Sequence, residues 1–352
     1  MLVINAAARF SRSFADFYVQ NIFPRISSIL AHISGLFPFS VGEVMIIIGI
    51  LLVFIGIPLF LIILIAKKDS RRKTAGAFLC TFLWIVTYIW STETLNCFVM
   101  YQCTPFSERY FSEQTEHTES ELKDLYKYLI DETNKIAEDV PRDADGRFYL
   151  TCDYDKEAKA AMKKAAMKYP QLKGYFPTAK KINFSYFMSQ SNLLGIYFPF
   201  SMESNYNKDM VSGNIPSTIC HEYAHLKGII QEDEANFISF IANAESENIE
   251  FRYSGYLNVL EYVHNEVYKQ EVTSAYGLTD TISENVRKDW FRFMPDTYWE
   301  ENKKKEIIPT ETVRAASDAS IDLNIKMNGR EDGIKAYSHV VNLLLDYYSS
   351  ED

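Results

Sequence analysis

The sequence predicts a mainly helical α+β protein in which two membrane-spanning helices precede a domain with a small sheet. Two apolar runs, one at residues 44–66 and one that starts at residue 74 and ends at residue 90 or 100, stand close together near the N-terminus. Two short stretches, residues 181–187 and 193–200, are rich in aromatic and β-branched residues, which is typical of strands. Most of the remaining sequence repeats its apolar residues at helical spacing. We expect the chain to divide into three parts, residues 1–42, 43–105 and 106–352.

Composition limits the classes of partner. The chain has 352 residues, 14% of them aromatic, which is enough for a sizeable core, and its formal net charge is −10. A net negative charge argues against nucleic acid as a partner, because phosphates bind basic surfaces. The five cysteines show no spacing typical of a metal site or a disulfide framework, so we expect free thiols.

Residues 1–42 are amphipathic rather than uniformly apolar. Phe14, Tyr18, Ile22 and Ile26 recur near helical spacing, and Pro24 interrupts the pattern. This predicts a pair of helices that packs on the core or lies at the membrane interface, and not a further span.

The two apolar runs predict a transmembrane hairpin. Residues 44–66 carry no charge and are long enough to cross a bilayer, and Pro58 would kink this helix without ending it. A basic cluster at residues 67–73 separates the two runs. Because Lys and Arg favour cytoplasmic loops, this loop is expected in the cytoplasm and both outer ends of the hairpin outside it. The sequence therefore predicts a multi-pass protein of the cell membrane, with the lipid bilayer as a partner and residues 106–352 extracytoplasmic.

Residues 106–352 combine helices with the two short strands. Thr118 and Glu121 form a capping-box pattern that opens a helix. The stretch 193–200 contains Pro199, which suits an edge strand and not a central one. The polar run 203–207 either lines the rim of a cleft or is a plain connecting loop. Further helical patterns cover residues 155–168, 251–270, 282–305 and 333–348.

The strongest motif is H-E-x-x-H, formed by His221, Glu222 and His225. Pro216 is tolerated in the first turn of a helix, and Gly228 stands where a helix ends in a left-handed residue. Residues four apart on a helix share one face, so both imidazoles can reach a single ion. Glu222 lies beside the first histidine, where a carboxylate can act as general base toward water at the metal.

The next helix is expected to supply the third ligand, because a catalytic zinc site uses three protein donors and a water. Glu232 and Glu234 are two residues apart and cannot both face the metal. We predict Glu234, because Glu232 falls in the first turn, where the helix dipole already favours a carboxylate. The predicted site is therefore Zn²⁺ held by His221, His225 and Glu234.

These residues resemble the gluzincin metallopeptidases, in which H-E-x-x-H is followed by a glutamate motif such as E-D-E-A-N-F here (residues 232–237). The chain is also similar to an uncharacterised bacterial family of membrane-anchored, zincin-like proteins, known only as a domain of unknown function. The matching segments are residues 37–43, 195–207, 221–228, 232–237, 252–257 and the tail from Lys326.

The resemblance implies a zincin-like metallopeptidase domain with a small edge-stranded sheet. It also implies His221, His225 and Glu234 as ligands, Glu222 as base, and an edge strand at 193–200 against which an extended substrate pairs. Asn236 stands where the wider group usually has Asp. A donor for the developing oxyanion is also needed. Tyr337, His339 and His264 are candidates, and Tyr337 is favoured because it lies in a matching segment.

Together these features predict a membrane-anchored zinc-dependent metalloendopeptidase that hydrolyses a peptide or protein near the membrane. In that reaction Glu222 takes a proton from metal-activated water and passes it to the leaving amine. The alternative is a non-catalytic, membrane-anchored binding or sensor module with a structural zinc. An open, water-bearing position at the metal would separate the two.

Overall fold

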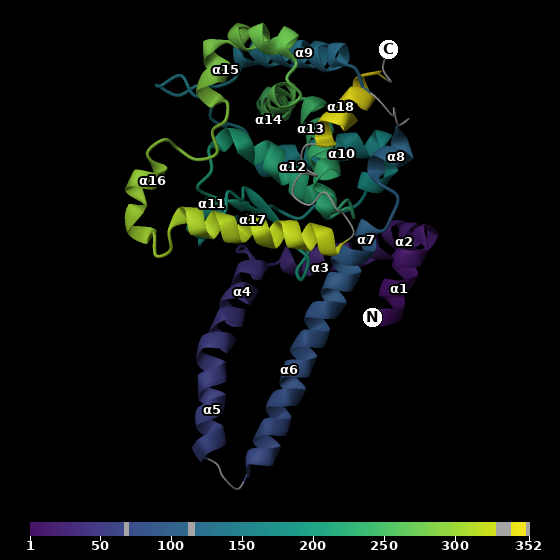
Figure 1. The fold of residues 1–352 in the computed structure, drawn as a ribbon, viewed down its shortest axis with the longest axis vertical. Coiled ribbons are helices and arrows are strands. Elements are labelled where there is room, and N and C mark those ends of the chain that lie inside the picture. Colours follow the sequence, from purple (N-terminus) through teal and green to yellow (C-terminus); the bar gives the residue numbers. More distant parts are fainter. Residues whose placement is uncertain (67–69, 112–116, 329–338, 350–352) are drawn as a thin grey trace.

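A computed structural model describes residues 1–66, 70–111, 117–328 and 339–349. It shows a helical domain with a small sheet, from one side of which two long helices project (Figure 1). This arrangement confirms the mainly helical architecture, the small sheet and the two apolar helices that the sequence predicts.

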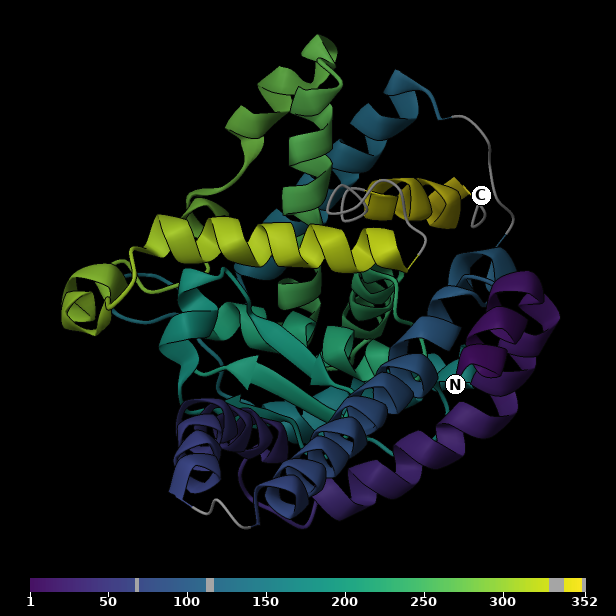
Figure 2. The ribbon, with the colours of Figure 1, turned by 60° about the horizontal axis from the view of Figure 1, so that its bottom comes forward.

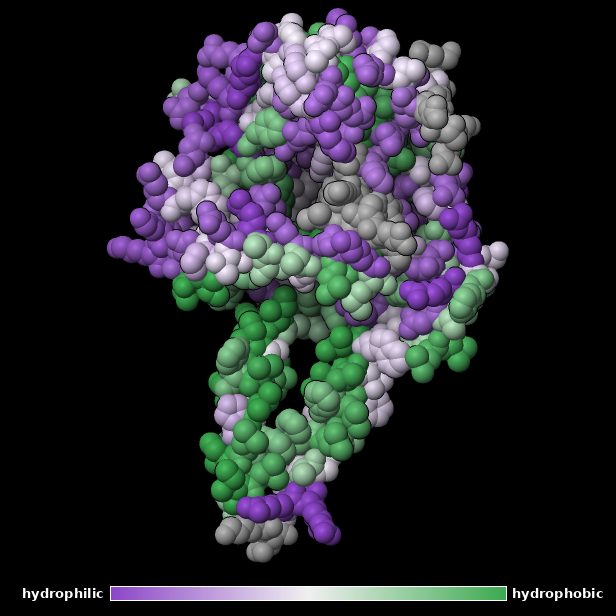
Figure 3. All heavy atoms as spheres, in the orientation of Figure 1, coloured by the Kyte–Doolittle hydropathy of each residue, from purple (hydrophilic) through white to green (hydrophobic). Residues whose placement is uncertain are grey.

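The first projecting helix runs from Val41 to Ala66 and the second from Arg71 to Tyr101, and both are long and apolar enough to cross a membrane. The first comprises α4 (Val41–Leu51), a π-helical turn η2 (Leu52–Gly56) and α5 (Ile57–Ala66). The second comprises α6 (Arg71–Glu93), η4 (Thr94–Phe98) and α7 (Val99–Tyr101). Hydrophobic side chains cover both helices along the part that leaves the domain (Figure 3). We call them the first and the second apolar helix.

The N-terminal helices pack against the domain. They are α1 (Leu2–Phe10), α2 (Arg12–Phe17), η1 (Tyr18–Ile22) and α3 (Phe23–Ser34). Val19 and Phe23 are buried in the same core as the domain, and the Ser27 hydroxyl donates to the Leu226 carbonyl at 2.9 Å. The sequence left two roles open for these helices, packing on the core or lying at the membrane interface. The face that carries Val19, Phe23 and Ser27 packs on the core. Buried residues of the N-terminal helices and of the domain thus form one core.

The sheet has three strands, β1 (Lys180–Ile182), β2 (Gly195–Phe198) and β3 (Glu203–Asn207), in the order β1–β3–β2. β1 is parallel and β2 antiparallel to β3. β2 is therefore an edge strand, as predicted from Pro199. The first predicted strand, 181–187, is only partly correct, because helix α11 (Ser185–Gln190) follows β1 directly.

β3 is the polar run expected as a rim or a loop, and both expectations are wrong. It is the central strand and is buried along its whole length. Glu203 and Tyr206 bond distant segments, and the Tyr206 hydroxyl lies 2.7 Å from that of Tyr154. The Glu203 carboxylate accepts the backbone N–H groups of Val41 (3.0 Å) and Gly42 (2.8 Å) and the Lys180 ammonium. The first apolar helix thus begins on a carboxylate of the sheet, which also suits its helix dipole.

The helices of the domain surround α12 (Ile215–His225), which packs against β2 and β3 on one side and against α13 (Glu232–Ala244) and α14 (Ile249–Lys269) on the other. The predicted capping box opens α9 (Glu119–Ala137), and α10 (Tyr154–Lys168) matches the second predicted helix. The predicted helix 282–305 is instead broken into short pieces. The remaining elements are α8 (Phe106–Tyr110), η5 (Pro170–Leu172), η6 (Ser212–Asn214), η7 (Thr273–Thr281), α15 (Glu284–Asp289), α16 (Tyr298–Glu301), η8 (Lys303–Lys305), α17 (Thr310–Met327) and α18 (Val340–Ser349).

Helix α17 runs across the side of the domain from which the apolar helices leave (Figures 1 and 2). It is held at both ends. The Gln190 side-chain amide donates to the Ile308 carbonyl at 2.9 Å, just before α17, and the Gln102 side-chain amide donates to the Asn328 carbonyl at 2.9 Å, just after it. The second of these bonds ties α17 to the end of the second apolar helix.

Candidate metal centre

Helix α12 carries the two histidines and ends as the sequence predicts. Gly228 has a φ of +82°, the left-handed conformation that favours glycine, and the Ile229 N–H returns to the Ala224 carbonyl at 3.2 Å. A Cβ atom on Gly228 would also lie 3.0 Å from Val19 of the N-terminal helices. The end of the histidine-bearing helix is thus held by a turn that is closely packed.

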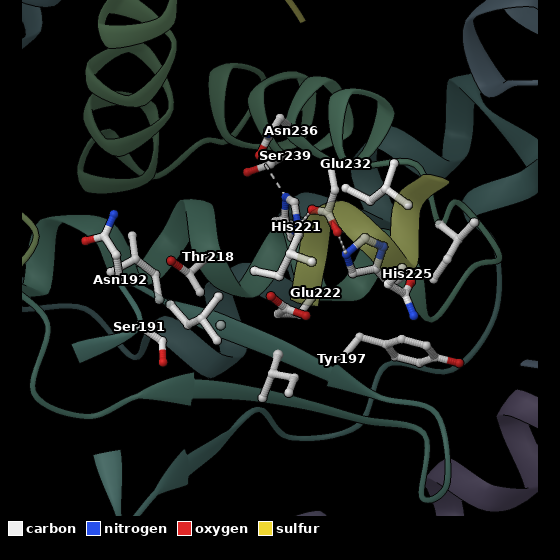
Figure 4. Close-up of a pocket in the computed structure, with 18 of the residues that line it drawn as sticks. Ser191, Asn192, Tyr197, Thr218, His221, Glu222, His225, Glu232, Asn236 and Ser239 are labelled. Carbon is white, nitrogen blue, oxygen red and sulfur yellow. Dashed lines mark hydrogen bonds and ion pairs between the residues drawn. The ribbon is translucent and has the colours of Figure 1, made fainter. Parts of the chain in front are cut away.

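The imidazoles of His221 and His225 converge on one carboxylate, that of Glu232 (Figure 4). Nε2 of His221 lies 3.1 Å from one oxygen of Glu232, and Nε2 of His225 lies 3.8 Å from the other. One ligand atom from each of the three residues lies within 4.8 Å of the other two. This spacing is compact enough for the three atoms to hold one ion.

Hydrogen bonds on the far side of each ring fix which nitrogen faces this point. Nδ1 of His221 lies 2.8 Å from Oδ1 of Asn236, and Nδ1 of His225 lies 2.8 Å from the carbonyl oxygen of Ile229. Both partners are acceptors, so each Nδ1 carries a hydrogen, and Nε2 is the nitrogen of each ring that is left to bind a metal once it has no proton. Asn236 therefore takes the orienting role that an Asp would have.

The predicted third member, Glu234, does not face the histidines, and that part of the predicted site is corrected to Glu232. The Glu234 carboxylate accepts the N–H of Ser107 at 3.0 Å and its hydroxyl at 2.5 Å. Asn236 bonds His221, so the face of α13 that carries Asn236 is turned toward the histidines. Glu232, four residues before Asn236, lies on that same face of the helix. Both glutamates lie in the first turn of α13, so the helix dipole could not distinguish them.

Glu222 lies beside the histidines and points toward β2 (Figure 4). It is 4% exposed, and its Oε2 atom has no hydrogen-bond partner in the described part of the chain. Burial raises the pKa of the Glu222 carboxyl to about 8, although the nearby charge of His221 and a hydrogen bond from the Tyr197 backbone act in the opposite direction. A buried carboxylate with a free oxygen has room to bind a proton donor such as water.

Burial opposes a positive charge on both imidazoles. It lowers the pKa of His225 to about 4. At His221 burial acts in the same direction, but the hydrogen bond and charge of Glu232 outweigh it, and the pKa of His221 is raised to about 9. The carboxylate of Glu232 thus attracts a positive charge to the point where the three side chains meet.

The site lies in a cavity of about 720 Å³. Its walls come from β2, α12, α13, α14, α17 and the end of the second apolar helix that joins the domain. Sequence reasoning missed the contribution of α14, whose Asn258, Glu261 and Tyr262 line the cavity. The only signal in the sequence is their spacing, because Asn258 and Glu261 are polar residues three apart and so share one face of the helix.

The two described candidate donors, His264 and His339, do not lie in the cavity wall. The His264 ring bonds the Tyr126 hydroxyl at 2.8 Å and packs against Trp290, and it does not line the cavity. Nδ1 of His339 lies 3.9 Å from the carboxylate of Asp233, outside the cavity lining. Tyr337 lies outside the described residues.

Comparison with protein families matches residues 18–345 to the family described as Protein of unknown function (DUF3810). No curated protein and no solved structure matches the chain. The match includes both apolar helices, the edge strand and the His221, His225 and Glu232 cluster. The chain therefore belongs to the DUF3810 family of proteins of unknown function.

Proposed function

We propose that this protein is a membrane-anchored, zinc-dependent peptidase. The observation that carries the proposal is the convergence of His221, His225 and Glu232 beside Glu222, whose carboxylate faces a free strand edge. Two imidazoles and one carboxylate are a donor set that zinc takes in catalytic sites.

The surroundings of these donors fit a catalytic zinc better than a structural one. Structural zinc sites are usually closed by four protein ligands, whereas catalytic sites keep a position open. Here three donors lie in a cavity, and Glu222 adds a carboxylate with an unpartnered buried oxygen. This favours the peptidase over the binding or sensor module with a structural zinc.

Zinc, when bound, would polarise the scissile carbonyl and make a water acidic enough to be activated near neutral pH. Glu222 takes the proton from the attacking water and delivers it to the leaving amine. His221 and His225 hold their Nε2 atoms toward the same point, and Asn236 and Ile229 keep the rings in that orientation.

The edge of β2 provides a place for an extended substrate. The Asn207 N–H donates to the Leu194 carbonyl at 2.7 Å, next to the β2–β3 ladder. Hydrogen-bonded and non-bonded pairs alternate along an antiparallel ladder, so the peptide groups of Gly195 and Tyr197 point away from β3. The Tyr197 N–H donates to Glu222, so a substrate strand could pair with the Gly195 peptide groups and the Tyr197 carbonyl, as peptides do at exposed sheet edges.

The proposal includes the topology. We place both apolar helices across the bilayer, with the basic residues 67–73 in the cytoplasm and the domain on the other side. The enzyme would then act at the extracytoplasmic surface of the cell membrane.

The test uses the full chain purified in detergent, with zinc content and hydrolysis of a mixed peptide library measured together. Glu222→Gln should keep about one zinc per chain and the fold, but lose roughly 10²–10⁴-fold in hydrolysis, because an amide cannot accept the water's proton. Glu247→Gln, a change at an exposed glutamate, is the control. Equal hydrolysis by wild type and Glu222→Gln would overturn the proposal, and so would zinc-loaded wild type that cleaves nothing.

A further inference from the structure

The cavity begins at the point where the second apolar helix enters the domain. Glu93, Cys97 and Tyr101 of this helix line it together with Gly195 and Tyr197 of β2. Glu93 lies only three residues beyond Trp90, which is about 4.5 Å of helix rise. Tryptophan is typical of the membrane interface, and Trp90 is exposed. The open edge of β2 therefore lies close to the expected bilayer surface.

The domain presents apolar side chains on the same side. Hydrophobic atoms gather along the lower border of the domain beside the projecting helices (Figure 3). Large exposed apolar residues occur in the segments next to these helices: Phe37 and Phe39 precede the first apolar helix, and Leu323 and Met327 lie in the last turns of α17. Apolar surface of this kind suits contact with lipid, so the domain would sit against the bilayer and not above it on a long stalk.

The lining of the cavity is acidic. Among the described lining residues there are five carboxyl groups and no lysine or arginine. Glu222 and Glu232 belong to the proposed catalytic centre. The other three come from three different elements: Glu93 from the second apolar helix, Glu261 from α14 and Asp318 from α17. They therefore surround the space beside the centre from several sides.

Among these carboxyl groups, Glu261 has no positively charged partner in the described part of the chain. Its carboxyl group makes no hydrogen bond or ion pair with the described residues, and burial raises its pKa to about 7. A half-buried carboxyl group without a partner costs more to ionise than an exposed one, and a cation placed next to it would offset that cost. The side chains that best complement this acidic lining are those of lysine and arginine.

We propose that the substrate of this site is the extended, lysine- or arginine-containing segment of another membrane protein immediately outside the bilayer. This inference rests on the proposed peptidase function. The backbone of the segment would pair with the edge of β2, and its basic side chain would enter the space bounded by Glu93, Glu261 and Asp318. A span that holds the segment at the bilayer surface would deliver it at the height of the cavity.

Binding to the zinc-loaded Glu222→Gln protein in lipid nanodiscs tests the inference without hydrolysis. The first probe is a single apolar helix of about 20 residues followed by a Gly/Ser segment that contains lysines, with a fluorophore at its end. The second probe has glutamine in place of each lysine. The third is the lysine segment without the helix, and the fourth is the helix alone.

We expect the first probe to bind at least about tenfold more tightly than each of the other three. Asp318→Lys should weaken binding of the lysine probe by about tenfold and leave the glutamine probe unchanged. Asp322→Lys, one turn further along α17 and outside the cavity lining, is the matched control and should have no effect. Equal binding of lysine and glutamine probes, or of tethered and free probes, would overturn the inference. Tight binding of the helix alone would indicate recognition of an apolar span instead.

The two proposals fail in different ways. If wild type hydrolyses free and tethered probes equally and Glu222→Gln hydrolyses neither, the peptidase stands and the substrate inference is wrong. If the lysine probe binds selectively but wild type with zinc cleaves no probe, the substrate inference stands as a binding preference and the peptidase is wrong.

Discussion

A Cβ atom on Gly195 would lie 2.3 Å from Oε1 of Glu222. The backbone of the edge strand therefore comes as close to the carboxylate as a glycine allows. The N–H of Tyr197, two residues along the same strand, donates to that carboxylate. The strand proposed to bind substrate thus also positions the proposed general base.

Gly195→Ala should displace Glu222 and lower hydrolysis by about 10²-fold, because a misplacement of about 1 Å is enough for a loss of that size. Zinc content should not change, since the atoms nearest to an added Cβ belong to Glu222 and Thr218 and not to the His221, His225 and Glu232 cluster. Gly277→Ala is the matched control, because a Cβ at that position would meet nothing within 4 Å. Full activity in Gly195→Ala would argue against Glu222 as the base.

Zinc content should distinguish the two glutamates of α13. Glu232→Ala is expected to lose the metal, because it removes the only carboxylate that faces both histidines in the described part of the chain. Glu234→Ala should keep the metal but lower the free energy of unfolding by about 1–3 kcal/mol, since Ser107 loses its acceptor. Metal analysis and thermal unfolding of the two variants check this. The opposite pattern of metal loss would restore Glu234 as the ligand.

Asn236→Ala should weaken zinc binding by about 10–100-fold, which is the usual effect of losing a group that orients a metal-binding histidine. Asn236→Asp should bind zinc at least as well as wild type, because a carboxylate also accepts the His221 Nδ1–H bond. Competition with a chelator gives both affinities. Asn243→Ala, which removes a buried amide further along the same helix, should affect stability and not zinc affinity. A similar loss of affinity in both alanine variants would point to a general loss of structure.

Glu261→Gln should change how stability depends on pH. Burial raises the pKa of Glu261 from 4.5 to about 7, so the folded state holds this proton more tightly than the unfolded state. The stability that the carboxyl group contributes is therefore complete below pH 4.5 and is lost as the pH rises to about 7. Relative to wild type, the variant should become more stable over that interval, by an amount on the order of 1–3 kcal/mol. Thermal unfolding of both proteins across the interval, in the absence of zinc, measures the difference. A difference that does not vary with pH would show that Glu261 titrates normally.

The proposed topology predicts which positions an impermeant thiol reagent reaches in whole cells. With the five native cysteines replaced, a cysteine at Ser70, in the loop between the apolar helices, should be protected. A cysteine at Ser120, on the exposed start of α9, should react. Permeabilised cells, in which both should react, are the control. The reverse pattern in intact cells would place the domain in the cytoplasm.

The parts of the site that follow from local periodicity could be predicted from the sequence. His221, Glu222 and His225 lie on one helix, and Gly228 marks its end, so their relative positions depend only on helical geometry. The third member could not be fixed in that way, because the direction of Glu232 depends on how the chain turns between the two helices. The bond from His221 to Asn236 settles it, and that bond is a tertiary contact.

The polar strand β3 shows a second limit of local reasoning. Its residues, Glu203 to Asn207, have the composition of a loop, yet the strand is buried in the centre of the sheet. It is stable there because its partners come from far along the chain: Val41 and Gly42 donate to Glu203 from the start of the first apolar helix. No sequence window includes both sides of such a contact, whereas Pro199 marks β2 as an edge strand by itself.

The packing of the N-terminal helices determines what proteolytic release of the domain from the membrane would do. Val19 and Phe23 cover the turn at Gly228, and Ser27 bonds the Leu226 carbonyl, so residues that precede both apolar helices support the end of the helix that carries both histidines. A protease that cut the chain between Tyr101 and Thr118 would leave these supporting residues attached to the membrane. The released fragment would lack part of its own core, and the His221, His225 and Glu232 cluster would lose its shape. We therefore expect that the protein cannot be shed as a working soluble enzyme and that cleavage of this connection would inactivate it.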